Sequence, residues 1–395
     1  MEPLVTSLTA VAVRLAAAIL PLGLSLTGAV ACELCVKAAN ERLNLVDQLI
    51  HADRVVLARL DRPDGHLTIA ASIKGDDRPG TLIAESVPLY GEPVRKPFFT
   101  AVMEARIDLA SRSEPFLLVG GGIHPGWTNL GTIGEENSDW LRSLAAASSS
   151  LKVDAGWGGI PAEPGSEAVQ GETWRGRVLQ ALPHLDGTVR SLERDLAWSE
   201  ILGAPYGSLA VAKGRLTPEQ VSAWLGDPSF ATEVAGILHL YGYVGGTEGA
   251  KRVRERLLRA AEAHDTAVLA PLLAAHLELE GPSRVDWIVE TYFGDRSRSM
   301  AEIQAALVAL RLQGEANATI PRVRVVSALR RFIAERPAMA GSVAMTLSDW
   351  ACWEAREDFE AIMASGAIPD PASEFAVALY LKRAAEASRS NGESQ

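Results

Sequence analysis

The chain has 395 residues, of which 48% are hydrophobic, 22% are charged and 6% are aromatic, and its formal net charge at pH 7 is −11. This composition excludes a disordered or collagen-like chain and supplies enough apolar residues for a sizeable core. The length predicts two domains, because a domain averages roughly 150 residues. The negative charge argues against a general phosphate-binding surface, so we expect no nucleic-acid partner and no charge-driven binding to anionic membranes.

The first residues have the pattern of an export signal. The apolar run Leu15–Leu26 has the length of a signal-peptide core, and an Ala-x-Ala pattern ends at Ala31, directly before Cys32. We predict a signal peptide over residues 1–31, cleavage between Ala31 and Cys32, and an exported protein of the periplasm or cell envelope. An uncleaved anchor is one alternative; lipidation of Cys32 is another, although Ala29 stands where such a signal usually has leucine. We expect membrane contact only through that anchor or lipid.

The chain contains three cysteines, Cys32, Cys35 and Cys352. Export implies an oxidising compartment, in which thiols tend to pair. Three arrangements stay open: a local Cys32–Cys35 disulfide, a long-range Cys35–Cys352 disulfide, or lipidated Cys32 with the other two cysteines left over. Redox chemistry would need a preceding strand, and a zinc site would need a second pair of ligands at metal spacing; the sequence offers neither. We therefore expect a structural or lipid-anchoring role, with no metal and no cofactor.

Residues 32–147 are predicted to form a β-rich module. Strand-like runs begin at Arg54 (RVVLARL), His66 (HLTIAASI), Thr81 (TLIAESV) and Pro115 (PFLLVGG), and turn-forming residues separate the first three. Apolar residues at helical spacing over 39–52 predict one helix before them. The segment from 53 to about 134 is therefore expected to be a small antiparallel sheet or barrel.

This module resembles the netrin-type fold. The resemblance rests on the cysteines near the mature N-terminus, ADRVVLARL from Ala52, SIKG from Ser72 and FLLV from Phe116. It implies a five-stranded barrel of the OB type, shared with tissue inhibitors of metalloproteinases. Those inhibitors begin Cys-x-Cys, whereas this chain has two residues between Cys32 and Cys35, so the resemblance implies the fold and not the inhibitory activity.

Residues 148–171 are predicted to link two domains. The segment is rich in serine, glycine and proline and poor in large apolar residues, a composition typical of linkers.

Residues 172–385 carry apolar side chains at helical spacing almost throughout, and 386–395 form a polar tail. The segments Ile237–Leu258 and Ala306–Ile333 resemble HEAT-type repeats. We therefore expect an α+β, two-domain protein in which a small antiparallel barrel precedes an all-α HEAT-like solenoid or irregular helical bundle. The whole arrangement resembles exported bacterial proteins, a resemblance that brings no activity.

Two polar groups are candidates for function. His184, Asp186 and Asp195 form a dense polar group near the start of the helical region, and an acid–base or metal site would require them to converge from adjacent helices. We predict instead that Asp186 belongs to a turn that caps the next helix. The basic run Lys251–Arg259 could contact phosphate, but we predict a solvated face opposite the acidic residues of segment 354–360.

The sequence favours an exported, non-enzymatic protein that binds a protein partner, not yet identified, through a helical-repeat surface. Neither the Gly-x-Ser-x-Gly nor the His-Glu-x-x-His hydrolase signature occurs. The alternative is an envelope hydrolase or metal-dependent enzyme with weak candidate catalytic residues His184, Asp186 and Asp195.

Overall fold

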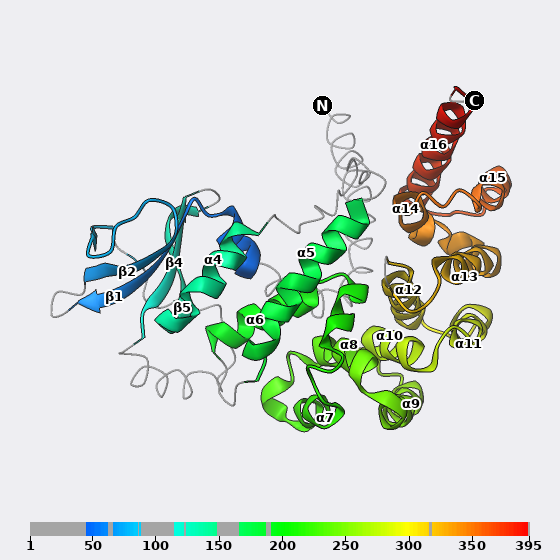
Figure 1. Cartoon of the computed structure of the whole chain (residues 1–395). Coiled ribbons are helices and arrows are strands. Elements are labelled where there is room, and N and C mark those ends of the chain that lie inside the picture. The colour runs from blue at the N-terminus through cyan, green and yellow to red at the C-terminus, as the bar shows by residue number, and fades with distance from the viewer. Residues whose placement is uncertain are drawn as a thin grey trace, which may run out of the picture. The chain divides into compact units, whose positions relative to one another are not determined.

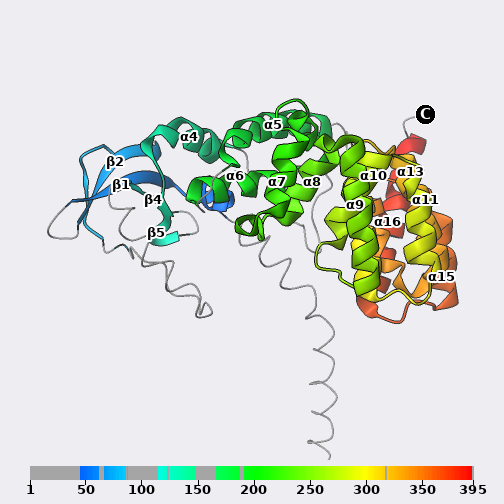
Figure 2. The same ribbon diagram turned by 90° about the horizontal axis from the view of Figure 1, so that it is seen from below.

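The computed structural model shows an α+β protein in which a five-stranded antiparallel sheet precedes a largely helical region (Figures 1 and 2). The structure describes residues 45–61, 66–85, 87, 114–121, 124–147, 166–186, 191–315 and 318–393. The predicted signal peptide, Cys32, Cys35 and residues 148–165 of the predicted linker lie outside these residues. The helix expected over 39–52 is seen at residues 45–51, within the part that is described.

The strands follow one another across the sheet in the order β3-β2-β1-β4-β5, and every neighbouring pair is antiparallel. Their bounds are Arg54–Asp61 for β1, His66–Lys74 for β2, Leu82–Ile83 for β3, Phe116–Gly121 for β4 and His124–Thr132 for β5.

Both faces of the sheet hold buried apolar side chains. Apolar residues stand at successive positions of the strands, and successive side chains point to opposite faces. One face holds a separate cluster formed by Val56, Ala58, Leu67, Ile69, Ile83, Leu118 and Trp127. The other holds Val55, Leu57, Ile73, Leu117 and Val119, which belong to the same apolar core as the helices. Helix α4, Ser138–Ala146, packs on β2 and buries Trp140, Leu141 and Leu144.

The sheet is open, so the expected closed barrel is wrong. In the described residues β3 pairs only with β2 and β5 pairs only with β4, which makes these two strands the edges. Closure requires the edge strands to pair and all strands to share a matching stagger. Strand β3 has two residues and offers little backbone to pair with. Alternating apolar residues look the same in an open sheet and in a barrel, so the sequence pattern could not separate them.

The structure confirms the prediction that the chain after the sheet region is largely helical. Its α-helices are α5 Ser166–Ala181, α6 Leu192–Gly203, α7 Pro218–Gly226, α8 Val234–Val244, α9 Gly246–Ala263, α10 Leu269–Glu280, α11 Arg284–Ile288, α12 Met300–Gly314, α13 Arg322–Glu335, α14 Gly341–Asp349, α15 Arg356–Ser365 and α16 Pro371–Glu393. A 3₁₀ segment, η4 (Tyr206–Ala212), precedes α7, and a π-helix, η6 (Val289–Gly294), follows α11. None of the helices in the described ranges is long and apolar enough to cross a membrane.

Local sequence signals set where several helices begin. Thr217 caps α7: its hydroxyl accepts a hydrogen bond from the Gln220 backbone N–H at 3.1 Å, and Pro218 takes the first helical position. Helix α12 begins with a reciprocal capping box between Ser299 and Glu302.

Helices pack both on the next helix in the chain and on the helix after that. Helix α10 packs on α8, on α9 and on α12, and α14 packs on α16. A glycine allows one of these contacts: a Cβ on Gly242 of α8 would lie 2.7 Å from the Tyr206 hydroxyl and 3.2 Å from the Ala275 Cα. The backbones of α8 and α10 can therefore approach closely only where Gly242 has no side chain.

Candidate functional site

His184 lies at the junction between the sheet region and the helices. Its Nδ1 atom is 2.6 Å from a Glu193 carboxylate oxygen, and its ring stacks on Trp140 with centroids 4.0 Å apart and an interplanar angle of 8°. The Asn137 side-chain amide donates to the other Glu193 oxygen at 3.5 Å. These contacts join α4, the short helix Leu182–His184 and α6, so they give His184 a structural role in holding the junction.

Asp186 and Asp195 make other contacts. The Asp186 carboxylate accepts a hydrogen bond from the Trp224 indole N–H at 3.3 Å. Asp195 lies in the first turn of α6, where its backbone carbonyl accepts from the Ser199 hydroxyl at 2.8 Å. His184 and Asp186 thus hydrogen-bond different partners. Across the described residues, no group of three or more His, Cys, Asp or Glu side chains could hold a metal ion.

A buried polar cluster that no sequence motif indicates lies between η4, α8, α10 and α12. The Glu278 carboxylate accepts hydrogen bonds from Thr319 and, at 3.4 Å, from Gln313, whose amide also donates to the Ala274 carbonyl at 3.1 Å. Burial raises the pKa of the Glu278 carboxyl. The Tyr243 hydroxyl is buried and has no hydrogen-bond partner among the residues described. Glu278 lies in α10, Gln313 in α12 and Thr319 in the loop before α13, so the cluster corresponds to no short sequence motif.

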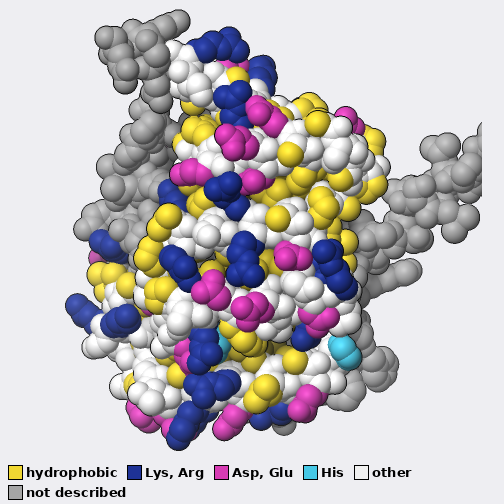
Figure 3. Space-filling model, turned by 90° about the vertical axis from the view of Figure 1, so that its right-hand side faces the viewer, with side chains coloured by type: hydrophobic (Ala, Val, Ile, Leu, Met, Phe, Trp, Pro, Cys, Tyr) yellow, Lys and Arg dark blue, Asp and Glu magenta, His cyan; other side chains and the backbone are white. Residues whose placement is uncertain are grey.

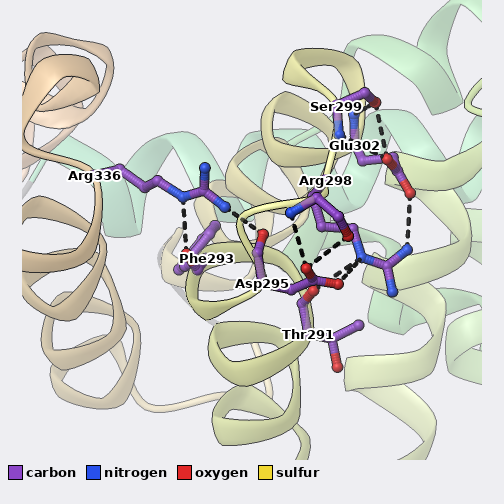
Figure 4. A network of polar contacts seen from close by, with 8 residues as sticks. Thr291, Phe293, Asp295, Arg298, Ser299, Glu302 and Arg336 are labelled. Atoms are coloured by element: carbon purple, nitrogen blue, oxygen red, sulfur yellow. Dashed lines mark hydrogen bonds and ion pairs between the residues drawn. The ribbon is translucent and has the colours of Figure 1, made fainter.

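A second network of polar contacts lies at the C-terminal end of the π-helix η6 (Figure 4). The Arg298 guanidinium donates to the Thr291 carbonyl at 3.1 Å and to the Glu302 carboxylate at 2.9 Å, and it lies 3.2 Å from the Asp295 carboxylate. Arg336, at the end of α13, donates to the Phe293 carbonyl at 2.8 Å. Cations on the last carbonyls of a helix are stabilising, so this network explains how η6, α12 and α13 are held together.

Two hollows lie beside the outer helices. The larger, which we call the α13/α15 groove, has a volume of about 560 Å³. It is lined by Arg322, Val323, Val326, Ser327, Arg330, Arg331, Ala334, Cys352, Glu354 and Asp358. The smaller, which we call the α7/α9 cleft, has a volume of about 260 Å³ and is lined by Ser222, Leu225, Gly226, Leu238, Tyr241, Arg252, Val253, Glu255, Arg256 and Arg259.

Charges of both signs alternate with apolar side chains on the face shown in Figure 3.

The prediction that basic helix α9 opposes segment 354–360 is wrong. Charged residues of α9 and of segment 354–360 form ion pairs with other residues. Lys251 and Arg252 lie 3.5 Å and 3.8 Å from Glu248 of the same helix, and Arg254 pairs with Glu280. In segment 354–360, Asp358 pairs with Arg330 at 2.6 Å and Glu360 pairs with Arg356 at 2.7 Å.

Cys352 lines the α13/α15 groove. Its thiol lies 3.6 Å from the Trp350 carbonyl, and its own carbonyl accepts a hydrogen bond from the Tyr380 hydroxyl at 2.7 Å. No disulfide is seen in the described part of the chain, so the structure does not show a bridge from Cys352. The local pairing of Cys32 with Cys35 lies outside the described residues and stays a prediction.

Comparison of the chain with protein-family models, with curated proteins and with solved structures gives no match. These comparisons identify no family for this chain.

Proposed function

We propose that this is an exported, non-enzymatic protein that binds a partner protein through a HEAT-like array of helices. The packing of α8 on α10 and of α10 on α12, with α7, α9 and α13 beside them, supports a stack of helical pairs. Such stacks present long surfaces to other proteins. We propose that the N-terminal sheet is netrin-like in its five antiparallel strands, although it is open.

The observation that carries the proposal is the α13/α15 groove. Its apolar lining includes Val323, a large hydrophobic side chain that is 73% exposed. Apolar surface left in water costs roughly 25 cal/mol per Å², and clustered exposed apolar residues often mark interaction sites. A partner that covers Val323 would recover that free energy.

The charges around the groove indicate what kind of segment fits. Arg330 is paired with Asp358 at 2.6 Å, whereas the half-exposed Arg331 lies 4.0 Å from the Asp286 carboxylate. We propose that the occupant is a segment of a partner protein with an apolar anchor over Val323 and an acidic side chain that reaches Arg331. Arginine suits this role because its planar group binds carboxylates through two hydrogen bonds.

Site-specific photo-crosslinking in the producing cells tests the groove. A photoreactive residue replaces the exposed Ser327 inside the groove or, as the matched control, the exposed Ser388 on α16. We expect one discrete protein adduct from position 327 and none from position 388. Val323→Asp should abolish the adduct and Val323→Ile should preserve it. Absence of an adduct at 327, or equal adducts at both positions, would overturn the proposal.

Export is tested separately by the mass of the purified protein. A mature chain that begins at Cys32 would support cleavage after Ala31, and a diacylglycerol-sized increase would support lipidation of Cys32. A mass that retains residues 1–31 would contradict cleavage. The hydrolase alternative gains no specific support, because His184 and Asp186 hydrogen-bond Glu193 and Trp224 separately.

A further inference from the structure

Helix α9 turns one row of arginines toward the α7/α9 cleft. Arg252, Arg256 and Arg259 are four and three residues apart, which places them on one face of a helix, and all three line the cleft. Arg254, between them in sequence, instead pairs with Glu280 of α10. The basic residues of α9 therefore lie on two sides of the helix. One side carries Arg254, which is paired with Glu280, and the other faces the cleft.

The cleft arginines are only partly neutralised. Arg252 donates to the Ser222 hydroxyl and lies 3.8 Å from Glu248, and Arg256 donates to the Leu225 carbonyl at 3.4 Å. Within the described residues, neither Arg256 nor Arg259 forms an ion pair with a carboxylate. Glu255 is the acidic side chain of the lining, so the lining keeps an excess of positive charge.

Part of the cleft lining is apolar. Leu238 and Tyr241 of α8 and Val253 of α9 line it, and all three are buried. Low-polarity surroundings strengthen the attraction between a guanidinium and an anion, because fewer water dipoles screen it. A volume of about 260 Å³ suits a small ligand and not a chain segment.

We infer that the α7/α9 cleft binds the phosphate group of a small phosphorylated compound. Guanidinium groups present fixed forks of N–H donors that match phosphate oxygens, and three of them can surround a group with three terminal oxygens. The partly exposed side chain of Leu225, which also lines the cleft, would contact the organic part of the compound. The overall charge of −11 disfavours a long polyanion but leaves one basic cleft open to a small anion.

Calorimetric titration of the full mature chain with inorganic phosphate and with glycerol 3-phosphate tests the inference. Ionic strength is held constant with chloride, because salt screens exposed charges. We expect saturable binding, weakened about tenfold by Arg259→Gln and by Arg256→Gln, since a hydrogen bond to a charged group contributes about 1.4 kcal/mol or more. Arg259→Lys should weaken binding less, and Glu255→Gln should strengthen it.

Lys251→Gln is the matched control, because it removes one positive charge from the same helix at a side chain that does not line the cleft. It should leave affinity within about twofold of the parent protein. Equal weakening by Lys251→Gln and Arg259→Gln would show general charge attraction and overturn the inference. Absence of saturable binding to inorganic phosphate, to glycerol 3-phosphate and to vesicles that contain phosphatidic acid would also overturn it. Circular dichroism of each variant confirms folding, and the two arginine variants test the cleft independently.

The phosphate group could belong to a free compound or to a lipid headgroup. Sedimentation with phosphatidylcholine vesicles, with and without phosphatidic acid, separates these sources. Binding only to vesicles that contain phosphatidic acid, lost in Arg259→Gln, would assign the cleft to a headgroup. Binding to glycerol 3-phosphate without vesicle binding would assign it to a free compound. Either result supports a phosphate site.

Discussion

The Arg177–Glu200 pair shows how a buried charge is accommodated between helices α5 and α6. Two guanidinium nitrogens donate to the two Glu200 oxygens, each at 2.6 Å, and the side chains are only 9% and 1% exposed. The ring of Trp174 lies 3.9 Å from the Arg177 guanidinium carbon. Both charges therefore depend on each other for the hydrogen bonds that water would otherwise supply.

Arg177→Met should lower the free energy of unfolding by about 3–5 kcal/mol, because it leaves the Glu200 carboxylate buried without a counter-charge. The double variant Arg177→Met/Glu200→Leu should lose less, since neither charge then remains. Urea unfolding of the two variants and the parent measures both effects. A double variant less stable than the single one would contradict this explanation.

His276 should make stability depend on pH. It is 3% exposed, 3.9 Å from Glu280, and burial lowers its pKa from 6.5 to about 4, with Arg254 and Arg284 acting in the same direction and Glu280 opposing them. The unfolded chain therefore binds a proton at a higher pH than the folded chain does. The contribution of His276 to the free energy of unfolding should therefore decrease as the pH falls from about 6.5 to 4, by up to about 1.4 kcal/mol per pH unit.

His276→Leu should remove this part of the pH dependence. The exposed His264 gives the control, and His264→Asn suits its left-handed backbone, with φ of 50°. Urea unfolding at a series of pH values compares the three proteins. Identical slopes between pH 4 and 6.5 for the parent and His276→Leu would show that His276 titrates normally in the folded protein.

At the level of single elements, the start of α12 depends on its cap. The Ser299 hydroxyl accepts from the Glu302 backbone, while the Glu302 carboxylate accepts from the Ser299 backbone at 2.9 Å. Ser299→Ala should therefore lower the free energy of unfolding by about 1 kcal/mol. The control is Ser327→Ala in the middle of α13, which should change stability little. Chemical denaturation distinguishes them; equal effects would rule out a role for the cap.

The elements that the sequence predicted are those whose signals are local. Runs rich in Val, Ile and Leu identified β1, β2 and β4, and apolar residues at helical spacing identified the helical region. Strand β5, His124–Thr132, was not identified, because its proline and glycines normally interrupt strands. It forms because an edge strand pairs on one side only and tolerates them. The Glu278 cluster joins residues far apart in the chain, so periodicity could not reveal it.

In the molecule as a whole, one apolar core contains residues from both sides of the predicted linker, from the sheet region and from the helical region. Leu117 of β4, Leu141 of α4, Val178 of α5 and Leu185 belong to one cluster. The segment between them, 148–171, is the predicted domain boundary, and α5 begins inside it at Ser166. Folding of the two regions should therefore be coupled through shared side chains even if the connecting backbone is cut.

Limited proteolysis tests this coupling. We expect the first cut between residues 148 and 165, because glycines, serines and prolines with few apolar neighbours leave backbone open to proteases. The two fragments should nevertheless elute together in size-exclusion chromatography, since Leu141 and Val178 lie in one core. Leu141→Ala should cost about 2–5 kcal/mol and release the fragments. First cuts inside 230–330 would contradict the boundary, and fragments that separate without mutation would show that the core does not hold the regions together.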